Sequence, residues 1–189
     1  MIDNGFPQFG FQNFYISRHE SRCPLIPGVV TFLNKLMENH TRFDLSTPLV
    51  SVCYGKRIII NSALPNTTKF DNRDFLEIVD YDHTKHTYLL IGLSEPPIET
   101  PLHWTILNAK KEINILLQIR VGLLNTQLSA KFPKTSGEYV PQSLENIGEI
   151  LKLMRNKNCI VMENNTILCA GFDLQDVESL IYKILEEKL

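Results

Sequence analysis

Two pairs of polar residues near the middle of the chain have the types and spacing that a binding site requires. Glu99 and His103 are four residues apart, which places both on one face of a helix, and both side chains can exchange protons. Gln118 and Arg120 are two residues apart, so alternation along a strand keeps them on one face. A guanidinium beside an amide favours a carboxylate or a phosphate as ligand. The helix pair and the strand pair are therefore the first candidates for polar site residues.

The segment Glu95–Arg120 predicts the elements that position this site, namely a loop, a helix and a buried strand. Thr100 is expected to cap the helix, and Pro101 suits its first turn. The run over 113–121 is mostly apolar and predicts the strand. Three apolar residues share a second face of the helix and predict its buried side: Leu102, Ile106 and Leu107.

The order of these motifs resembles the class II aldolase/adducin head-domain family. In that family the helix opens with a Pro-Ser-Ser-Glu motif, where this chain has Pro96-Pro97-Ile98-Glu99. The family strand ends in His-x-His, where this chain has Gln118-Ile119-Arg120. A later Asn-His-Gly turn of the family is matched by Asn164-Asn165-Thr166. The resemblance covers residues 27–189 and implies the fold of that family.

The resemblance also implies what chemistry the matched positions would carry. In the family three histidines bind zinc, which stabilises an enediolate, and the glutamate acts as general acid/base. Here Gln118, Arg120 and Asn165 stand at the histidine positions. Amides are poor zinc ligands and an arginine has no lone pair to donate. We therefore expect no metal ligands and no cofactor at these positions; zinc or another divalent metal is expected only if displaced ligands support an enzyme.

The phosphate-binding turns of the family differ here as well. The matching regions read Pro48-Leu49-Val50-Ser51, Asn61-Ser62-Ala63-Leu64 and Pro97-Ile98, and contain no glycine. Backbone amides approach a phosphate less freely without glycine, and proline donates no hydrogen bond. The resemblance implies Glu99 as the candidate catalytic residue and a pocket formed by Ser51, Ser62, His103, Gln118, Arg120 and Asn165.

Several of these residues have a second interpretation. Glu99 could stabilise the helix N-terminus, and His103 could pack in the core through its ring. Arg120 could pair with Glu99 in place of the zinc cation, or lie exposed at the end of its strand. His83 and His86 lie in a polar hairpin, which predicts a solvated loop in place of a metal site.

Length, charge and cysteine usage exclude several classes of protein. A chain of 189 residues suits one domain with a core, and a net charge of −2 predicts no nucleic-acid partner. No apolar run approaches the roughly 18–20 residues that span a bilayer, so no membrane partner is expected. The four cysteines form no CxxC pair and predict reduced thiols in a cytoplasmic protein.

Hydrophobic periodicity predicts one α/β domain over residues 27–189, with three α/β/α layers around a central mixed, mainly antiparallel sheet. Ser143 and Asp173 are expected to cap the last two helices. The helix after Ser143 is expected to turn four residues inward: Leu144, Ile147, Leu151 and Met154. Residues 1–26 predict an aromatic-rich arm that covers its own domain or, alternatively, exchanges between subunits. The expected elements are helices over 27–40, 101–111, 144–155 and 174–189, and strands over 49–54, 57–63, 75–81, 87–91, 113–121, 159–162 and 167–170.

The resemblance and the altered ligands together predict a non-catalytic module for binding or assembly, as adducin heads are. The alternative is an aldehyde-lyase or epimerase that acts on a small sugar phosphate with a rearranged site. A small anionic ligand and a homo-oligomer, a tetramer by resemblance, are the expected partners.

Overall fold

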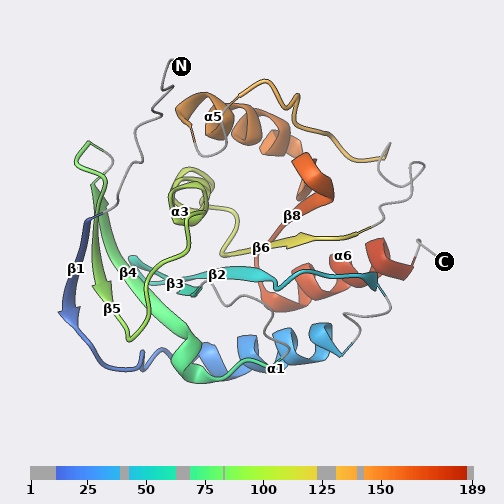
Figure 1. Ribbon diagram of the computed structural model, residues 1–189. Helices are drawn as coiled ribbons and strands as arrows, with labels where there is room; N and C mark the ends of the chain where they lie inside the picture. Colours follow the sequence, from blue (N-terminus) through green and yellow to red (C-terminus); the bar gives the residue numbers. More distant parts are fainter. Residues whose placement is uncertain are drawn as a thin grey trace, which may run out of the picture.

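A single mixed sheet forms the centre of the molecule (Figure 1). The computed structural model describes residues 12–38, 43–62, 69–82, 84–122, 131–139 and 143–186. The sheet has eight strands in the order β1-β5-β4-β3-β2-β6-β8-β7. The β1–β5 pair is parallel and the other six pairs are antiparallel. The strands are β1 (Gln12–Ser17), β2 (Leu49–Tyr54), β3 (Arg57–Asn61), β4 (Phe75–Asp82), β5 (Thr87–Ile91), β6 (Ile115–Arg120), β7 (Cys159–Met162) and β8 (Thr166–Gly171).

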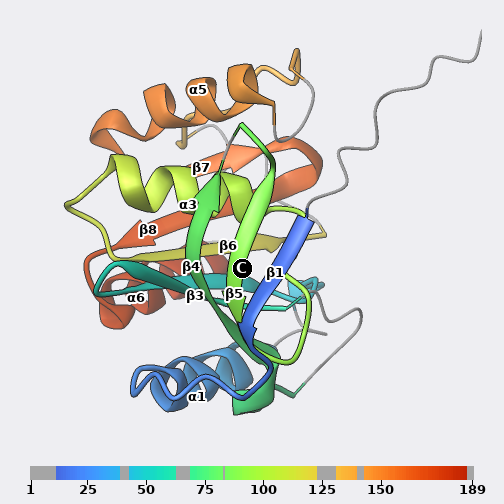
Figure 2. The ribbon, with the colours of Figure 1, turned by 90° about the vertical axis from the view of Figure 1, so that its left-hand side faces the viewer.

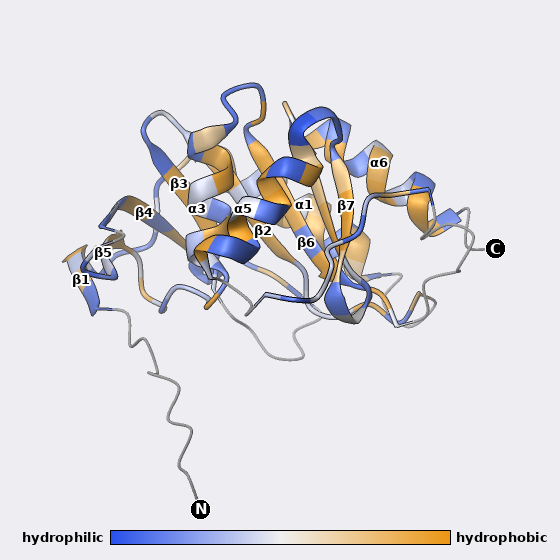
Figure 3. Cartoon of the chain, turned by 90° about the horizontal axis from the view of Figure 1, so that it is seen from above, coloured by the Kyte–Doolittle hydropathy of each residue, from blue (hydrophilic) through white to orange (hydrophobic). Residues whose placement is uncertain are grey.

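Helices cover both faces of this sheet, which confirms the predicted three-layer α/β/α fold. Helices α1 (Ile26–Met37) and α6 (Leu174–Glu186) lie on one face. Helices α3 (Thr100–Ala109) and α5 (Leu144–Leu153) lie on the other (Figures 1 and 3). Short 3-10 helices follow at Asn72–Asp74, Met154–Asn156 and Glu163–Asn165. No helix in the described ranges is long and apolar enough to cross a membrane.

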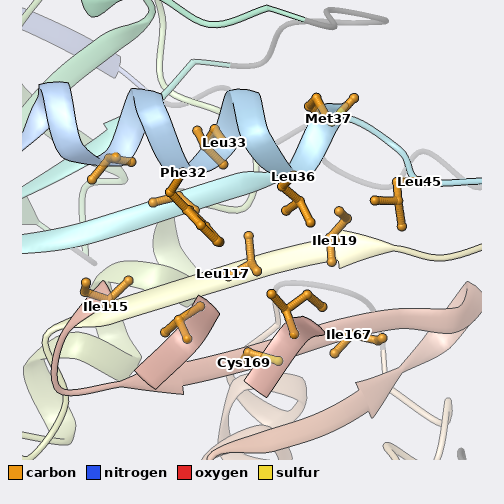
Figure 4. Packing of buried hydrophobic residues seen from close by; sticks show 14 of the residues in the cluster. Phe32, Leu33, Leu36, Met37, Leu45, Ile115, Leu117, Ile119, Ile167 and Cys169 are labelled. Carbon is orange, nitrogen blue, oxygen red and sulfur yellow. The ribbon is translucent and has the colours of Figure 1, made fainter. Parts of the chain in front are cut away.

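Alternation along the strands divides the buried side chains into two hydrophobic clusters, one on each face of the sheet. Strand β6 shows the division, because Leu117 and Ile119 belong to the cluster under α1 and α6, whereas Leu116 belongs to the other. Figure 4 shows Phe32 and Leu36 of α1 above the β6 side chains. Strand β6 is therefore buried on both faces, and polar side chains on it are exceptional.

The local start signals of the helices are mostly as predicted. The hydroxyl oxygen of Ser143 accepts the Asn146 N–H at 3.1 Å, and Asp173 Oδ1 accepts the Asp176 N–H at 3.0 Å. The predicted cap at Thr100 is wrong, because this residue is already helical and its hydroxyl donates to the Pro97 carbonyl at 2.6 Å.

Two further differences from the prediction concern where elements end and which way they face. Leu144, expected to point inward, is 77% exposed; it is the first residue of α5, and the buried residues of this helix are Ile147 and Ile150. Strand β6 spans Ile115–Arg120 and is shorter than the predicted run over 113–121. The Asn114 backbone nevertheless bonds to both neighbouring strands, because its N–H donates to the Gly171 carbonyl at 2.9 Å and its carbonyl accepts the Cys53 N–H at 2.7 Å.

Part of the predicted N-terminal arm belongs to the sheet. Residues 12–17 form β1, which pairs with β5, and the Tyr15 hydroxyl donates to the Ser94 carbonyl at 2.9 Å. The first eleven residues of the predicted arm lie outside the described residues.

Substitution of Gly92, just after β5, is expected to destabilise the fold. Its φ is 156°, and a Cβ there would lie 2.6 Å from the Leu76 Cβ and 3.1 Å from the Leu76 Cα. Backbone on the neighbouring strand must move to relieve this contact, so Gly92→Ala is expected to cost about 2 kcal/mol of unfolding free energy. Urea unfolding measures the loss. Gly148→Ala is the control, because nothing lies within 4 Å of its added Cβ on helix α5. That variant should gain about 0.5–1 kcal/mol, and equal effects of the two would contradict the prediction.

Candidate functional site

A chain of hydrogen bonds joins three of the predicted pocket residues across the centre of the sheet. Ser51 on β2 lies 2.7 Å from His103 Nδ1, measured from its Oγ. His103 Nε2 on α3 lies 3.3 Å from Gln118 Oε1 on β6. A carbonyl oxygen only accepts, so Nε2 carries the proton and Nδ1 accepts from the Ser51 hydroxyl. The pairing of β2 with β6, Leu49 opposite Gln118, brings the two strand residues under the same helix.

Burial keeps the imidazole of His103, at the centre of these hydrogen bonds, uncharged. His103 is 0% exposed, and Ser51 is buried equally completely. Desolvation lowers the pKa of His103 to about 4, and its hydrogen bond to Gln118 opposes part of that shift. The imidazole is therefore neutral at physiological pH and both of its nitrogens are engaged. In this state His103 holds α3 against β2 and β6, which agrees with the interpretation of His103 as a core residue.

Glu99 lies one helical turn before His103, and the His103 N–H donates to the Glu99 carbonyl at 3.2 Å. It is half-buried, directly before the first residue of α3. Its carboxylate forms no hydrogen bond or ion pair with another residue of the described segments. A half-buried carboxylate at a helix N-terminus is stabilised by the helix dipole and is available to a ligand.

Arg120 lies exposed at the end of β6. Its backbone is held by Ser46, whose N–H donates to the Arg120 carbonyl at 3.0 Å and whose Oγ accepts the Arg120 N–H at 3.1 Å. Of the two interpretations of Arg120, the pairing with Glu99 is not found: no ion pair between described residues includes the Arg120 guanidinium. The alternative, an exposed strand end, is what the structure contains. β6 stops being covered by α3 at this point, so its last side chain reaches solvent.

Asn165 meets the same strand end from the β7–β8 turn. Its carbonyl accepts the Val121 N–H at 3.1 Å, and its Nδ2 donates to the Gly122 carbonyl at 3.4 Å. Its φ of 56° is left-handed, a conformation that asparagine tolerates better than most residues. Arg120 pairs with Thr166, the next residue of that turn, so Arg120 and Asn165 border one edge of the sheet.

Ser62 stands apart from these contacts. It follows β3, its N–H donates to the Asp74 carbonyl at 2.7 Å, and its buried hydroxyl has no partner among the described atoms. The structure thus joins Ser51, His103 and Gln118 directly and places Arg120 and Asn165 together at the strand end.

Two residues near this edge were not singled out by the sequence analysis. Ser46 fixes the backbone of Arg120, and the Asp44 carboxylate packs against Gly122, where an added Cβ would lie 1.5 Å from Asp44 Oδ2. Neither residue lies in a motif. The hydrogen bond between Ser46 and Arg120 joins residues 74 positions apart, so the local spacing of the sequence could not predict it.

The donor set of this region does not fit a zinc ion held by three histidines. His103 has no free nitrogen, and the three matched positions carry Gln118, Arg120 and Asn165. Within the described part of the chain, no group of three histidine, cysteine, aspartate or glutamate side chains is arranged to hold a metal ion. His83 of the predicted solvated hairpin lies outside the described residues.

This geometry defines an α/β protein with the fold of the class II aldolases. L-fuculose 1-phosphate aldolase matches it with a TM-score of 0.64 and 13% identity, over 88% of this chain and 84% of that one. A sugar-phosphate aldolase from Thermotoga maritima matches with a TM-score of 0.61 and 11% identity, over 84% and 92%. An aldolase II superfamily protein from Pseudomonas syringae matches with a TM-score of 0.62 and 12% identity, over 88% and 74%. No protein-family model matches the sequence, and no curated protein matches it. The similarity is one of fold, which confirms the expected class II aldolase-like architecture.

Proposed function

We propose that this chain is a class II aldolase-like domain that binds a small anion at the end of β6 and performs no zinc-dependent lyase reaction. The observation that carries the proposal is the buried chain Ser51–His103–Gln118, in which the histidine is neutral and both ring nitrogens are engaged. Metal binding by His103 would require a ring nitrogen to be released inside the core.

The charge at the strand end supports an anion as the ligand. The Arg120 guanidinium is exposed, always charged and free of an ion pair with the described residues, so it can form two parallel hydrogen bonds to a carboxylate or phosphate. Asn165 borders the same strand end and Gln118 lies two residues away on β6, so the amide groups of both can donate to further ligand oxygens. Asp44 contributes a negative charge at Gly122, which favours a singly charged carboxylate or phosphate monoanion over a more highly charged ligand.

A second candidate is an aldehyde-lyase or epimerase that acts on a small sugar phosphate with displaced metal ligands. The observation in its favour is Glu99, whose carboxylate is half-buried, unbonded to described residues and positioned at a helix N-terminus. Such a carboxylate can act as general acid/base once a ligand covers it. This candidate requires a divalent metal, whereas the first requires none.

Metal analysis separates the two candidates. Tag-free protein purified in the presence of zinc would be analysed by elemental mass spectrometry, and cleavage of L-fuculose 1-phosphate would be assayed with and without chelator. Metal-free, folded and inactive protein is the expected result. Near-stoichiometric zinc with chelator-sensitive cleavage would overturn the proposal and establish the second candidate.

Removal of the Arg120 guanidinium is expected to weaken anion binding at least tenfold, because a bidentate charge-assisted contact is lost. Inorganic phosphate and acetate would be titrated into wild type and Arg120→Ala, with chemical shifts of backbone amides as the signal. Arg155→Ala is the matched control, since Arg155 is also exposed and lies on the 3-10 helix after α5. Equal affinities of wild type and Arg120→Ala would contradict the assignment.

We also propose that the chain forms a homo-oligomer in the cytoplasm. The resemblance to the class II aldolase/adducin heads supports assembly. The four cysteines, all free thiols, support a reducing compartment.

A further inference from the structure

The two edges of the sheet differ in how their backbone groups are satisfied. At the β7 edge the Val161 N–H donates to the Pro133 carbonyl at 2.9 Å, and the Thr135 N–H donates to the Val161 carbonyl at 3.1 Å. Residues 133–135 therefore cover that edge. At the other edge, β1 is the outermost strand (Figure 2), and it pairs only with β5 among the described strands. An open edge presents unpaired N–H and C=O groups to any strand that can join it.

The ladder between β1 and β5 identifies which groups are open. The Gln12 N–H donates to the His86 carbonyl at 2.9 Å, and the register pairs Gln12 with Thr87 and Phe14 with Leu89. In a parallel ladder, alternate residues bond to the neighbouring strand, so the backbone groups of Gln12 and Phe14 point to β5. The N–H and C=O groups of Asn13 and Tyr15 consequently point away from the sheet.

The register of β1 with β5 is regular from Gln12 to Tyr15 and shifts between Tyr15 and Ser17. Within the regular part, the side chains lack the charges and proline that usually protect an open edge. The strand QNFYIS contains no charged residue and no proline. Phe14 is 56% exposed and Ile16 55%, and both are on the outer face with Leu89 of β5, which is 36% exposed. This strip is apolar and continuous across two neighbouring strands.

We propose that β1 pairs antiparallel with β1 of a second copy of this chain, around a two-fold axis at Phe14. In this register Asn13 of each copy lies opposite Tyr15 of the other, so all four open backbone groups on each side form hydrogen bonds. Phe14 faces Phe14 of the second copy in the close, non-hydrogen-bonded position, and each Ile16 flanks Gln12 of the other copy. No charged side chains meet across the axis. The strand is therefore complementary to itself, which is the requirement for a symmetric interface.

This inference names the interface of the homo-oligomer proposed above and is independent of the anion site. Its test starts with the mass of the full chain in solution, measured by light scattering during gel filtration. We expect a mass of two chains or a multiple of two, and half that mass for Phe14→Asp, which places two like charges at the axis. Leu144→Asp is the control, because it makes the same change at an apolar residue that is 77% exposed on α5. That variant should keep the wild-type mass.

Cross-linking tests the register itself. Phe14→Cys should form a disulfide between two chains under mild oxidation, because the two positions face each other at the axis. Ile16→Cys should form at least tenfold less, because its counterpart lies several residues along the strand. The unsubstituted chain, with its own four cysteines, sets the background.

Three outcomes would overturn the interface. These are a monomeric wild-type chain, an unchanged mass for Phe14→Asp, or equal cross-linking at the two positions. A monomer whose Tyr15 amide is protected from hydrogen exchange would show that residues 1–11 or another part of the same chain cover the edge. Phosphate titration of the same samples keeps this failure distinct from failure of the anion site, since a monomer that binds phosphate through Arg120 leaves that proposal standing.

Discussion

Acidification from pH 7 to pH 4 is expected to remove about 3 kcal/mol of unfolding free energy through His103 alone. The pKa of His103 is about 4 in the folded chain, against about 6.5 for an unfolded histidine. Between these values the unfolded state binds a proton that the folded state does not. The stabilisation that comes from neutral His103 is therefore present above pH 6.5 and is lost as the pH falls towards 4. A difference of about 2.5 pKa units corresponds to about 3 kcal/mol.

Urea unfolding at a series of pH values measures this effect, with the fluorescence of Trp104 as the signal. Trp104 is the only tryptophan of the chain, it follows His103 on α3, and its ring meets Tyr81 edge-on at 6.5 Å. His103→Gln is the matched variant, because it cannot titrate while the other four histidines and all carboxylates are retained. Its stability should be lower at pH 7 but should change less between pH 6.5 and 4. Parallel curves for the two proteins would show that His103 is not buried in its neutral form.

The result also bears on catalysis. A general base works best when its pKa is near the working pH, and a histidine with a pKa of about 4 is almost entirely neutral there. Its Nε2–H donates to Gln118, and the lone pair on its Nδ1 accepts the Ser51 hydroxyl, so both ring nitrogens are already engaged. A titration of His103 near neutrality would favour the enzymatic candidate.

The fold was largely predictable because its elements carry strong local signals. The hairpin β2–β3 is an example: two apolar runs flank Gly55, whose φ of 62° suits the tight turn. Helix α1 has an apolar face that recurs with helical spacing, and it ends within three residues of the predicted boundary. Strand β1 was not predicted, because QNFYIS alternates only weakly and its partner, β5, is 70 residues away in the chain.

The candidate site was predictable in composition but not in its contacts. Strand alternation correctly placed Gln118 and Arg120 on one face, yet their environments are opposite, one bonded to His103 and the other exposed. Gln118 and Arg120 differ because α3 stops covering β6 between them. This difference comes from the packing of the helix on the sheet, and the spacing of the two residues does not predict it. For the same reason the bond between Ser51 and His103, which are 52 positions apart, follows from sheet order and not from any motif.

Glu77 on β4 was not singled out from the sequence, because it lies inside an apolar strand run. Its substitution is expected to cause the second large loss of unfolding free energy. Glu77 is 5% exposed, and its two carboxylate oxygens each accept a hydrogen bond of 2.7 Å, from the Ser21 hydroxyl and from the Arg57 guanidinium. Ser21 lies in the predicted arm, and its Oγ also accepts the Cys23 N–H at 3.2 Å. One buried carboxylate thus fixes the segment between β1 and α1 to strand β4.

Glu77→Ala is expected to lower the unfolding free energy by about 3 kcal/mol, because it removes two charge-assisted acceptors and leaves a buried hydroxyl without its partner. Arg57 is 45% exposed and can turn to water, which keeps the loss below that of a fully buried pair. Glu77→Gln should lose less, since its carbonyl can still accept from Ser21. Lys85→Ala removes an exposed ion pair of 3.8 Å with Asp82 and should cause no measurable change. Urea unfolding of the wild type and the three variants measures these differences in unfolding free energy. If Glu77→Ala were no less stable than Lys85→Ala, the carboxylate would not hold the segment to the sheet, and β1 would depend on its ladder with β5 alone.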